Sequence, residues 1–395
     1  MPDARPWSSD VELLLACATR RLDPAARARA DHALAAGADW TTVRTLASAH
    51  GLLPLLHAHA AGGALVVPPG VLAALRDDAA RVARRNLQLC AELAAIATAC
   101  AAQGIPLVPL KGPLLAESLY GSVALRQYRD LDVLVRRGDL RRFAALLRDR
   151  GYDVDRIPSS ELVLDNSYHL LARAPRRGGL LVEVHYSLVA HRTGHRQDYE
   201  SLEPVLETRR FMGQDVQAVP REEELVYLCE HGAKHAWTRL DWIATIAERL
   251  REPSLDWDRV DHYATRVGAR RRVAAALWLA ARLWDDVAVP AAFHWHGSAF
   301  VNRLILRRLH REPTRILAFP LERLRYLLWT DTGSAARLRR CWMTFVVPAP
   351  YDLDAMPSAA ARSPLRVLAR PLQLLSRWWG GQRAEVARRP PRDRA

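Results

Sequence analysis

The spacing of apolar residues changes twice along this chain, and these changes restrict the folds that it can adopt. From Ser9 to about Gly104, apolar residues recur at helical spacing, most regularly in "VLAALRDDAARVARRNLQLCAELAAIATACAAQG". Between Ile105 and about residue 220, short extended runs such as "IPLVPL" and "DLDVLVR" alternate with short amphipathic helices. From Glu222 to about Trp342 the helical spacing returns. This order predicts an α+β protein in which a small mixed β-sheet core is flanked by N-terminal and C-terminal helical domains.

The same changes divide the chain into four predicted parts. They are an N-terminal helical segment (1–104), an α/β core (105–220), a C-terminal helical domain (221–361) and a basic, partly disordered tail (362–395). Within the core, "ELVLDNSYHLLARAP" and "LLVEVHYSLVA" are expected to pair as a β-hairpin, because Gly178-Gly179 between them favours a tight turn.

Composition argues against several classes of protein. With 395 residues, half of them apolar, the chain is long enough to bury a sizeable core. Its five cysteines are scattered and have no C-x-x-C spacing, which argues against a disulfide framework and a structural zinc site. The N-terminus lacks the pattern of a secretory signal, and no run approaches the roughly 20 apolar residues of a membrane span. We therefore expect a cytoplasmic protein that is neither exported nor integral to a membrane.

The formal charge of +14 is unevenly distributed. Residues 362–395 hold nine arginines against Glu385 and Asp393, so this tail alone has a net charge of +7. Its mixture of Leu, Trp and Arg fits either weak contact with an anionic membrane surface or docking on the protein's own helical domain. Positive charge also attracts polyanions at low salt, so the sequence leaves a nucleic-acid partner open. The sequence does not indicate an oligomeric state.

A pair of carboxylates, Asp130 and Asp132, stands at the start of the apolar run "DLDVLV". Alternate residues of a strand share a face, with Cα atoms roughly 6.6–7 Å apart, so both carboxylates are expected to point away from Leu131. Such a pair can bind two divalent cations roughly 3.5–4 Å apart, an arrangement that stabilises phosphoryl transfer. A third carboxylate is expected from Glu183 in "LLVEVHYSL", where His185 shares its face.

Spacing alone does not identify this site, because the chain contains three further Asp-x-Asp pairs. They are Asp153/Asp155 in a predicted connection, Asp256/Asp258 before a helix that they are expected to cap, and Asp352/Asp354 among prolines. The pair Asp130/Asp132 differs from these in the ordered set of motifs around it.

A Lys-Gly-Pro turn precedes the carboxylate pair. Gly112 stands directly before a helix that is expected to begin at Pro113, where it can bring the backbone close to a phosphate. Pro113 has no N–H, which leaves the helix start one donor poorer, but Lys111 can compensate as a point charge. The turn is therefore predicted to hold a phosphate group.

Six stretches in one order resemble the uncharacterised nucleotidyltransferase family of the polymerase-β superfamily. They are "HGLLPLL", "LKGPLLAESLY", "LRQYRDLDVLV", "LLRDRGY", "VEVHYSL" and "LCEHGAKHAWTRLDWI", between about residues 51 and 250. The resemblance implies a minimal nucleotidyltransferase sheet with Gly112 at the glycine-containing helix start. It also implies that Asp130 and Asp132 are the metal-binding pair, that Glu183 is the third acidic residue, and that Arg126 contacts the triphosphate.

The chain departs from the superfamily's pattern at several points. Pro113 follows the glycine where Ser or Gly is usual, and Asp130 lies farther from the glycine than is usual. Thr245 stands where an Asp is expected after "RLDW", and Tyr186 stands where a Trp is expected after the histidine. The carboxylate triad is intact.

Two histidines of the last motif, His231 and His235, stand four residues apart and so share a helix face. This is a spacing that zinc ligands use, but the order is not H-E-x-x-H and no third ligand is evident. The expected role is a polar helix face near the active site, with Lys234 contacting nucleotide phosphates.

These features together predict a nucleotidyltransferase that moves a nucleotidyl group from a nucleoside triphosphate (NTP) such as ATP to an acceptor hydroxyl or phosphate, with release of pyrophosphate. Asp130 and Asp132 would bridge two Mg²⁺ ions, with Mn²⁺ as a substitute, and Glu183 would complete one metal site. The predicted nucleotide-binding residues are Lys111, Gly112, Arg126 and Lys234. The sequence names neither the base nor the acceptor. The alternatives are a nucleotidyltransferase fold that has lost catalysis and binds nucleotide, RNA or protein, and an RNA-binding or RNA-modifying protein.

Overall fold

The structure is a computed structural model that describes residues 7–158, 161–174, 178–190, 194–252, 255–297, 302, 306 and 320–347. The basic tail 362–395 and the pair Asp352/Asp354 lie outside the described residues. Within the described residues, no helix combines the length and the apolar character that crossing a bilayer requires.

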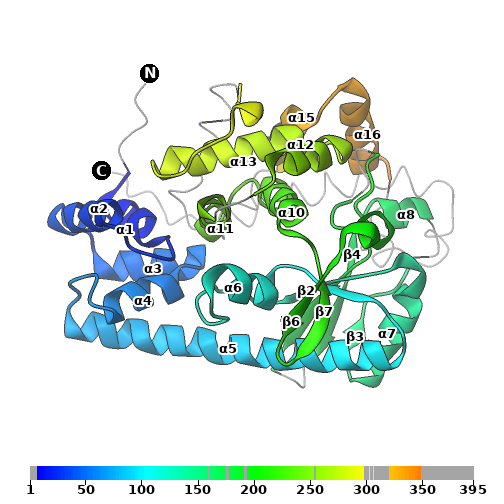
Figure 1. The fold of residues 1–395 in the computed structure, drawn as a ribbon, viewed down its shortest axis with the longest axis horizontal. Helices are drawn as coiled ribbons and strands as arrows, with labels where there is room; N and C mark the ends of the chain where they lie inside the picture. Colours follow the sequence, from blue (N-terminus) through cyan, green and yellow to red (C-terminus); the bar gives the residue numbers. More distant parts are fainter. Residues whose placement is uncertain are drawn as a thin grey trace, which may run out of the picture.

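The chain begins with five helices, in agreement with its helical spacing. They are α1 (Ser9–Cys17), α2 (Pro24–Ala35), α3 (Trp40–His50), α4 (Leu53–Ala61) and α5 (Pro69–Ala102). Each of the first three begins at a side-chain cap, and the cap of α1 is Ser8. The 34-residue helix α5 runs along one side of the molecule, from α4 to the sheet (Figure 1).

The α/β core follows α5. Its strands and helices are β1 (Leu107–Pro109), α6 (Gly112–Tyr120), β2 (Leu131–Val135), α7 (Leu140–Asp149), β3 (Asp153–Val154), α8 (Glu161–Asp165), β4 (His169–Ala174) and β5 (Leu180–His185). The strands form one sheet in the order β1-β2-β5-β4-β3. Strands β2 and β5 are parallel and the other neighbours are antiparallel, so the sheet is small and mixed as predicted.

Two predicted elements of the core differ from those observed. The run 161–174 was expected to be one arm of a hairpin, but it forms the short helix α8 before strand β4. Strand β4 does pair antiparallel with β5, which confirms the hairpin partner. Asp153 lies in the edge strand β3, where the pattern predicted a connection. Short apolar runs fit either a helix or a strand, and tertiary packing decides between them.

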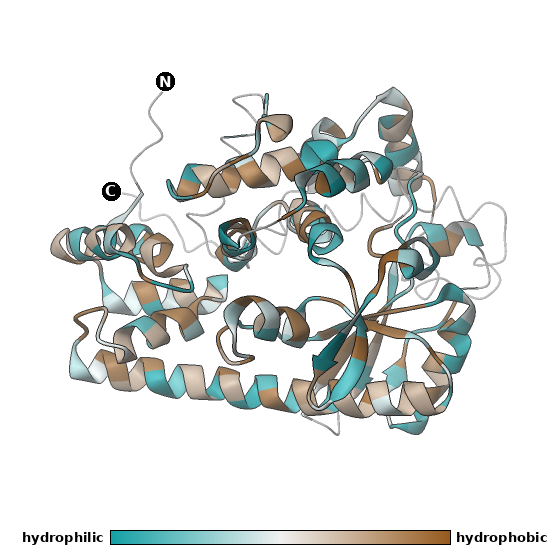
Figure 2. Ribbon diagram, viewed as in Figure 1, coloured by the Kyte–Doolittle hydropathy of each residue, from teal (hydrophilic) through white to brown (hydrophobic). Residues whose placement is uncertain are grey.

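A second, two-stranded sheet and a further group of helices complete the described fold. They are α9 (Tyr199–Leu202), β6 (Glu207–Phe211), β7 (Gln214–Ala218), α10 (Arg221–Lys234), α11 (Leu240–Arg251), α12 (Trp257–Arg266), α13 (Arg270–Leu283), α15 (Pro320–Thr330) and α16 (Ser334–Phe345). Asp256 caps α12 by accepting a hydrogen bond from the Arg259 N–H, as predicted. Figure 2 shows α13 as mostly apolar, in keeping with its burial against α10 and α11.

The buried apolar residues form two cores. One surrounds the five-stranded sheet and includes Val133 and Phe143. The other joins residues of α1 and α4, such as Leu14 and Leu56, to residues of α10–α13, such as Leu277. The N-terminal helices and the helices that follow the two-stranded sheet therefore share one core.

Two of the motifs found in the sequence dock on each other at the end of α3. The His50 Nδ1 accepts a hydrogen bond of 3.2 Å from the Leu240 N–H at the start of α11. Gly51 has a φ of +77°, and a side chain there would collide with the Arg239 guanidinium. Because Nδ1 is an acceptor, the imidazole is neutral. Burial, followed by the charge of Arg239, lowers the pKa of His50 to about 4.

This buried histidine predicts a loss of stability in mild acid. The folded pKa of about 4 lies below the ordinary 6.5, so the neutral ring stabilises the fold above pH 6.5, and this stabilisation is lost as the pH falls toward 4. The expected loss is about 3 kcal/mol. Urea unfolding of wild type and His50→Gln at pH 7.5 and 4.5 measures it, with His57→Gln as a matched control on α4. Parallel pH profiles for wild type and His50→Gln would contradict the assignment.

Candidate active site

The register of the parallel strands β2 and β5 places two carboxylates side by side. Asp132 lies opposite Glu183, and His185 lies two residues farther along β5 on the same face. Asp130 immediately precedes β2. On the other side of β2, the Leu110 N–H donates to the Asp132 carbonyl at 2.9 Å, which fixes the chain just before Lys111. The predicted triad therefore occupies one region of the sheet.

Cationic groups lie directly against the most buried carboxylate. The Lys111 Nζ is 2.8 Å from the Asp132 Oδ1, and the His185 Nε2 is 3.0 Å from the same oxygen. The His185 Nε2 is also 3.5 Å from the Glu183 Oε2. The Asp132 side chain is 2% exposed and that of Glu183 is 22% exposed. Glu183 is thus the carboxylate of this pair that an incoming molecule can reach.

Burial and neighbouring charges separate the pKa values of these carboxyl groups. For Asp132, burial is the largest influence and raises the pKa, but the charge of Lys111 and the hydrogen bond with His185 outweigh it and hold the pKa well below its usual range. For Asp130, burial and then the charge of Asp132 raise the pKa to about 6. The negative charge of Asp132 is therefore balanced by Lys111 and His185. Burial and the neighbouring Asp132 charge disfavour the charged form of Asp130.

The donor atoms fit a divalent cation. One ligand atom each from Asp132, Glu183 and His185 lie within 4.8 Å of one another. These three side chains form the cluster of potential metal ligands found among the described residues. Two carboxylates suit a hard cation such as Mg²⁺, and the added imidazole nitrogen suits Mn²⁺ as well. Asp130 lies outside this group, although the charges of Asp132 and Glu183 both contribute to raising its pKa. The cluster therefore differs from the predicted triad by having His185 in place of Asp130.

The Lys111–Gly112 turn brings α6 against the start of β2. Gly112 has a φ of +62°, a conformation that favours glycine, and its α-carbon faces the Asp130 carbonyl closely enough that a Cβ would lie 3.8 Å from that oxygen. Helix α6 begins at Gly112, one residue before the predicted Pro113. The start of α6 thus lies against the backbone of Asp130, and the N-terminal dipole of a helix favours an anion there.

Arg126 is a buried cation close to Asp130. It is 6% exposed, and its Nε is buried with no hydrogen-bond partner in the described part of the chain. Its charge lowers the pKa of Asp130 and of His231, so it lies near both. An unsatisfied buried donor is costly, and an anionic ligand would satisfy it. Arg126 is thus a buried cation with an unsatisfied donor in the neighbourhood of Asp130.

Asn86 supports Arg126, and sequence reasoning missed it. Its Nδ2 donates to the carbonyls of Val123 and Arg126, at 2.7 and 2.8 Å, so α5 holds the loop that carries this arginine. Asn86 is fully buried in an amphipathic helix. A lone amide on the apolar stripe of α5 was the available signal.

Lys234 lies elsewhere in the site. Its Nζ donates to the Tyr168 hydroxyl at 2.6 Å and lies 4.2 Å from the centre of that ring, just before β4. Its contact with Tyr168 therefore places it beside the start of β4, whereas Lys111 and Gly112 directly follow β1, on the other side of the carboxylates in the strand order.

The two histidines of α10 belong to an aromatic cluster. The His231 and His235 ring centres are 4.8 Å apart, and each lies 5.1 Å from the ring centre of Trp242. Burial, and next the charge of Lys111, lower the pKa of His231 well below its usual value. Neither histidine belongs to the metal-ligating group found among the described residues.

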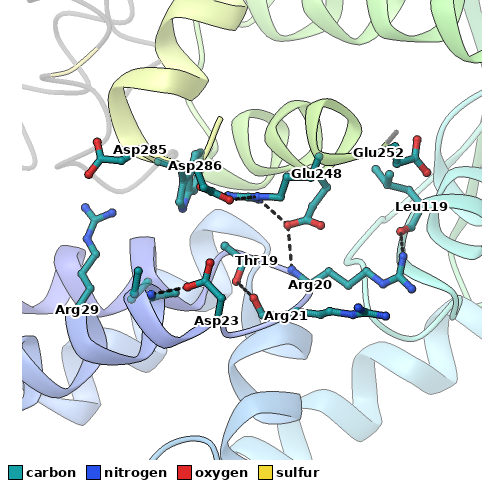
Figure 3. Close-up of a pocket in the computed structure, with 15 residues that line it drawn as sticks. Thr19, Arg20, Arg21, Asp23, Arg29, Leu119, Glu248, Glu252, Asp285 and Asp286 are labelled. Carbon is teal, nitrogen blue, oxygen red and sulfur yellow. Dashed lines mark hydrogen bonds and ion pairs between the residues drawn. The ribbon is translucent and has the colours of Figure 1, made fainter. Parts of the chain in front are cut away.

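A large cavity lies away from these carboxylates, at the opposite end of α6 (Figure 3). Its volume is about 710 Å³, and it lies between the N-terminal helices, α11 and the end of α13. Two of its arginines are engaged within the protein: Arg20 donates to the Leu119 carbonyl, and Arg251 pairs with Glu248 and Asp286. These contacts cap helix ends and join helices, so the cavity is separate from the chemistry of the sheet.

Comparison with known families agrees with this geometry. A family model described as an uncharacterised nucleotidyltransferase matches residues 36–285, more than half of the chain. The chain belongs to this family. Its assignment, together with the small mixed sheet and flanking helices, confirms the predicted family and fold class.

Two solved structures of nucleotidyltransferase type resemble parts of this nucleotidyltransferase family member. The antibiotic-resistance factor ANT(2'')-Ia matches at 16% identity and a TM-score of 0.33, over 46% of this chain and 90% of that chain. A nucleotidyltransferase-like protein from Paracoccidioides brasiliensis matches at 15% identity and a TM-score of 0.32, over 54% and 95%. No curated protein matches the chain.

Proposed function

We propose that this protein transfers a nucleotidyl group from an NTP to an acceptor hydroxyl or phosphate and releases pyrophosphate. The observation that carries the proposal is the pairing of Asp132 with Glu183 on β2 and β5, next to the Lys111–Gly112 turn. Membership of a nucleotidyltransferase family supports the reaction class.

The transfer exchanges one bond to the α-phosphorus for another. The acceptor oxygen forms the new bond, and the bond from phosphorus to the bridging oxygen breaks, so that its electron pair leaves with pyrophosphate. Glu183, the more exposed carboxylate, takes the proton of an acceptor hydroxyl. Lys111, Gly112 and Arg126 hold the triphosphate.

Asp132 and Glu183 would hold a Mg²⁺ ion, and Asp130 with Asp132 would share a second one. When bound, these ions neutralise charge on the phosphate oxygens and lower the barrier to their transfer. The raised pKa of Asp130 supports this arrangement, because a cation would offset the burial and the charge of Asp132 that raise it. Lys111 keeps Asp132 ionised and ready to bind.

A second candidate is a nucleotide-binding module without catalysis. The Lys111–Asp132 ion pair favours it, because the ammonium stands where a cation would approach Asp132. Pro113 favours it as well, since it removes one backbone donor from the start of α6. This module would bind an NTP through Arg126 and form no product.

Calorimetric titration of NTPs with Mg²⁺ tests the binding site. We expect Arg126→Met to weaken binding roughly 10–100-fold, because a charge-assisted hydrogen bond to phosphate contributes about 1.5–3 kcal/mol. The matched control is Arg129→Met, which removes an exposed cation three residues away and is expected to change the Kd less than twofold. Release of pyrophosphate by the wild type separates the enzyme from the module. Equal binding by both variants would remove Arg126 from the site.

A further inference from the structure

The Lys111–Gly112 turn, which is proposed to hold the NTP, and the Lys234–Tyr168 pair lie on opposite sides of the carboxylates in the strand order. Across the sheet, Lys111 follows β1, Asp132 and Glu183 lie on β2 and β5, and Tyr168 precedes β4. The registers also separate them along the strands. Asp132 aligns with Glu183, whereas His185 aligns with His169, two residues farther from the Lys111 turn.

Phosphoryl transfer requires the attacking and leaving oxygens to lie roughly in line with the phosphorus between them. If the proposed function holds and pyrophosphate leaves on the side of Lys111, the acceptor approaches from the β4 side. There the Tyr168 and His185 ring centres are 5.4 Å apart, and the Lys234 ammonium lies over Tyr168. The acceptor oxygen thereby meets Glu183, which lies between the two sides.

We infer that Lys234 and Tyr168 form the acceptor subsite, and that it takes a small hydroxylated molecule carrying an anionic group such as a phosphate. Lys234 supplies the positive charge for that group, and the half-buried Tyr168 ring supplies a flat surface. His169 adds a polar contact, because its Nδ1 is buried with no hydrogen-bond partner in the described residues. It faces the same side as His185, with ring centres 5.5 Å apart.

The assignment changes the role that the sequence suggested for Lys234. A lysine on the donor phosphates would contribute to NTP affinity, whereas a lysine in the acceptor subsite contributes to the choice of acceptor. Loss of the Lys234 charge would weaken NTP binding in the first case and reduce the preference for an anionic acceptor in the second.

The test uses the full chain with glycerol 3-phosphate and glycerol as acceptor probes and an NTP labelled at the α-phosphate. We expect the wild type to use glycerol 3-phosphate at least 10-fold better than glycerol. In Lys234→Met this preference is expected to fall to about twofold or less, through a higher KM for glycerol 3-phosphate, and Lys234→Arg is expected to restore part of it. Arg173→Met, which removes an exposed cation at the other end of β4, is the matched control and is expected to keep the preference.

Donor binding is measured separately, by calorimetry with a non-hydrolysable NTP analogue and Mg²⁺. Lys234→Met is expected to keep the Kd within twofold of wild type. A Kd raised 10-fold or more would overturn the inference and return Lys234 to the donor side. Equal use of the two probes by the wild type would also overturn it. Failure of the wild type to bind the analogue or to release pyrophosphate with any acceptor, water included, would instead overturn the proposed function.

Discussion

Asp132→Asn is expected to abolish nucleotidyl transfer, with turnover at least about 10³-fold below that of the wild type. The substitution keeps the shape of the side chain and its hydrogen bond with His185 but removes the charge that pairs with Lys111. Without that charge the Asp132–Glu183 pair no longer fits a divalent cation. Pyrophosphate release at saturating NTP and Mg²⁺ measures the loss.

The fold is expected to survive this change. Removing one partner of a buried ion pair commonly costs about 3–5 kcal/mol of stability. A smaller cost is expected here, because the Lys111 ammonium still has the negative charges of Asp130 and Glu183 nearby. Asp258→Asn is the matched control, because it makes the same substitution at an exposed Asp-x-Asp pair. Turnover above a tenth of the wild-type value in Asp132→Asn would refute the role of this carboxylate.

The carboxylates could be predicted from the sequence because their signal is local. Asp130 and Asp132 stand at the start of an apolar run with alternating faces, and Glu183 is a charge within a second such run. What the sequence does not contain is the register between β2 and β5. That register is long-range, and it alone brings Glu183 opposite Asp132 and His185 into the same cluster.

The position of Lys234 illustrates the same limit. Helical spacing places it on one face of α10 with His231, but periodicity carries no information about where the helix crosses the sheet. Packing against α11 and α13 sets that crossing, and it directs Lys234 to Tyr168 on the β4 side. The docking of His50 on Leu240 likewise joins residues 190 positions apart, and no local pattern specifies such a contact.

Gly232→Ala is expected to destabilise the protein by about 3 kcal/mol or more, through overpacking in the core. After α10 the chain turns back through Ala236 and Trp237, both with positive φ, and the Trp237 ring packs onto the α-carbon of Gly232. A Cβ at this position would overlap three carbons of that ring. The ring cannot move aside freely, because it is fully buried and its Nε1 donates to the Tyr326 hydroxyl at 2.8 Å. Urea unfolding of wild type and variant measures the effect.

The Gly232→Ala substitution is also expected to change the active site. Helix α10 carries both Gly232 and Lys234, so a displacement of its last turn is expected to move Lys234 away from Tyr168. Gly70→Ala, at an open position in the first turn of α5, is the matched control and is expected to stabilise the protein by up to about 1 kcal/mol. If the strain is steric, Gly232→Ala with Trp237→Phe should lose less stability than the two single variants combined. Additive losses would show that the Trp237 ring is not what the glycine accommodates.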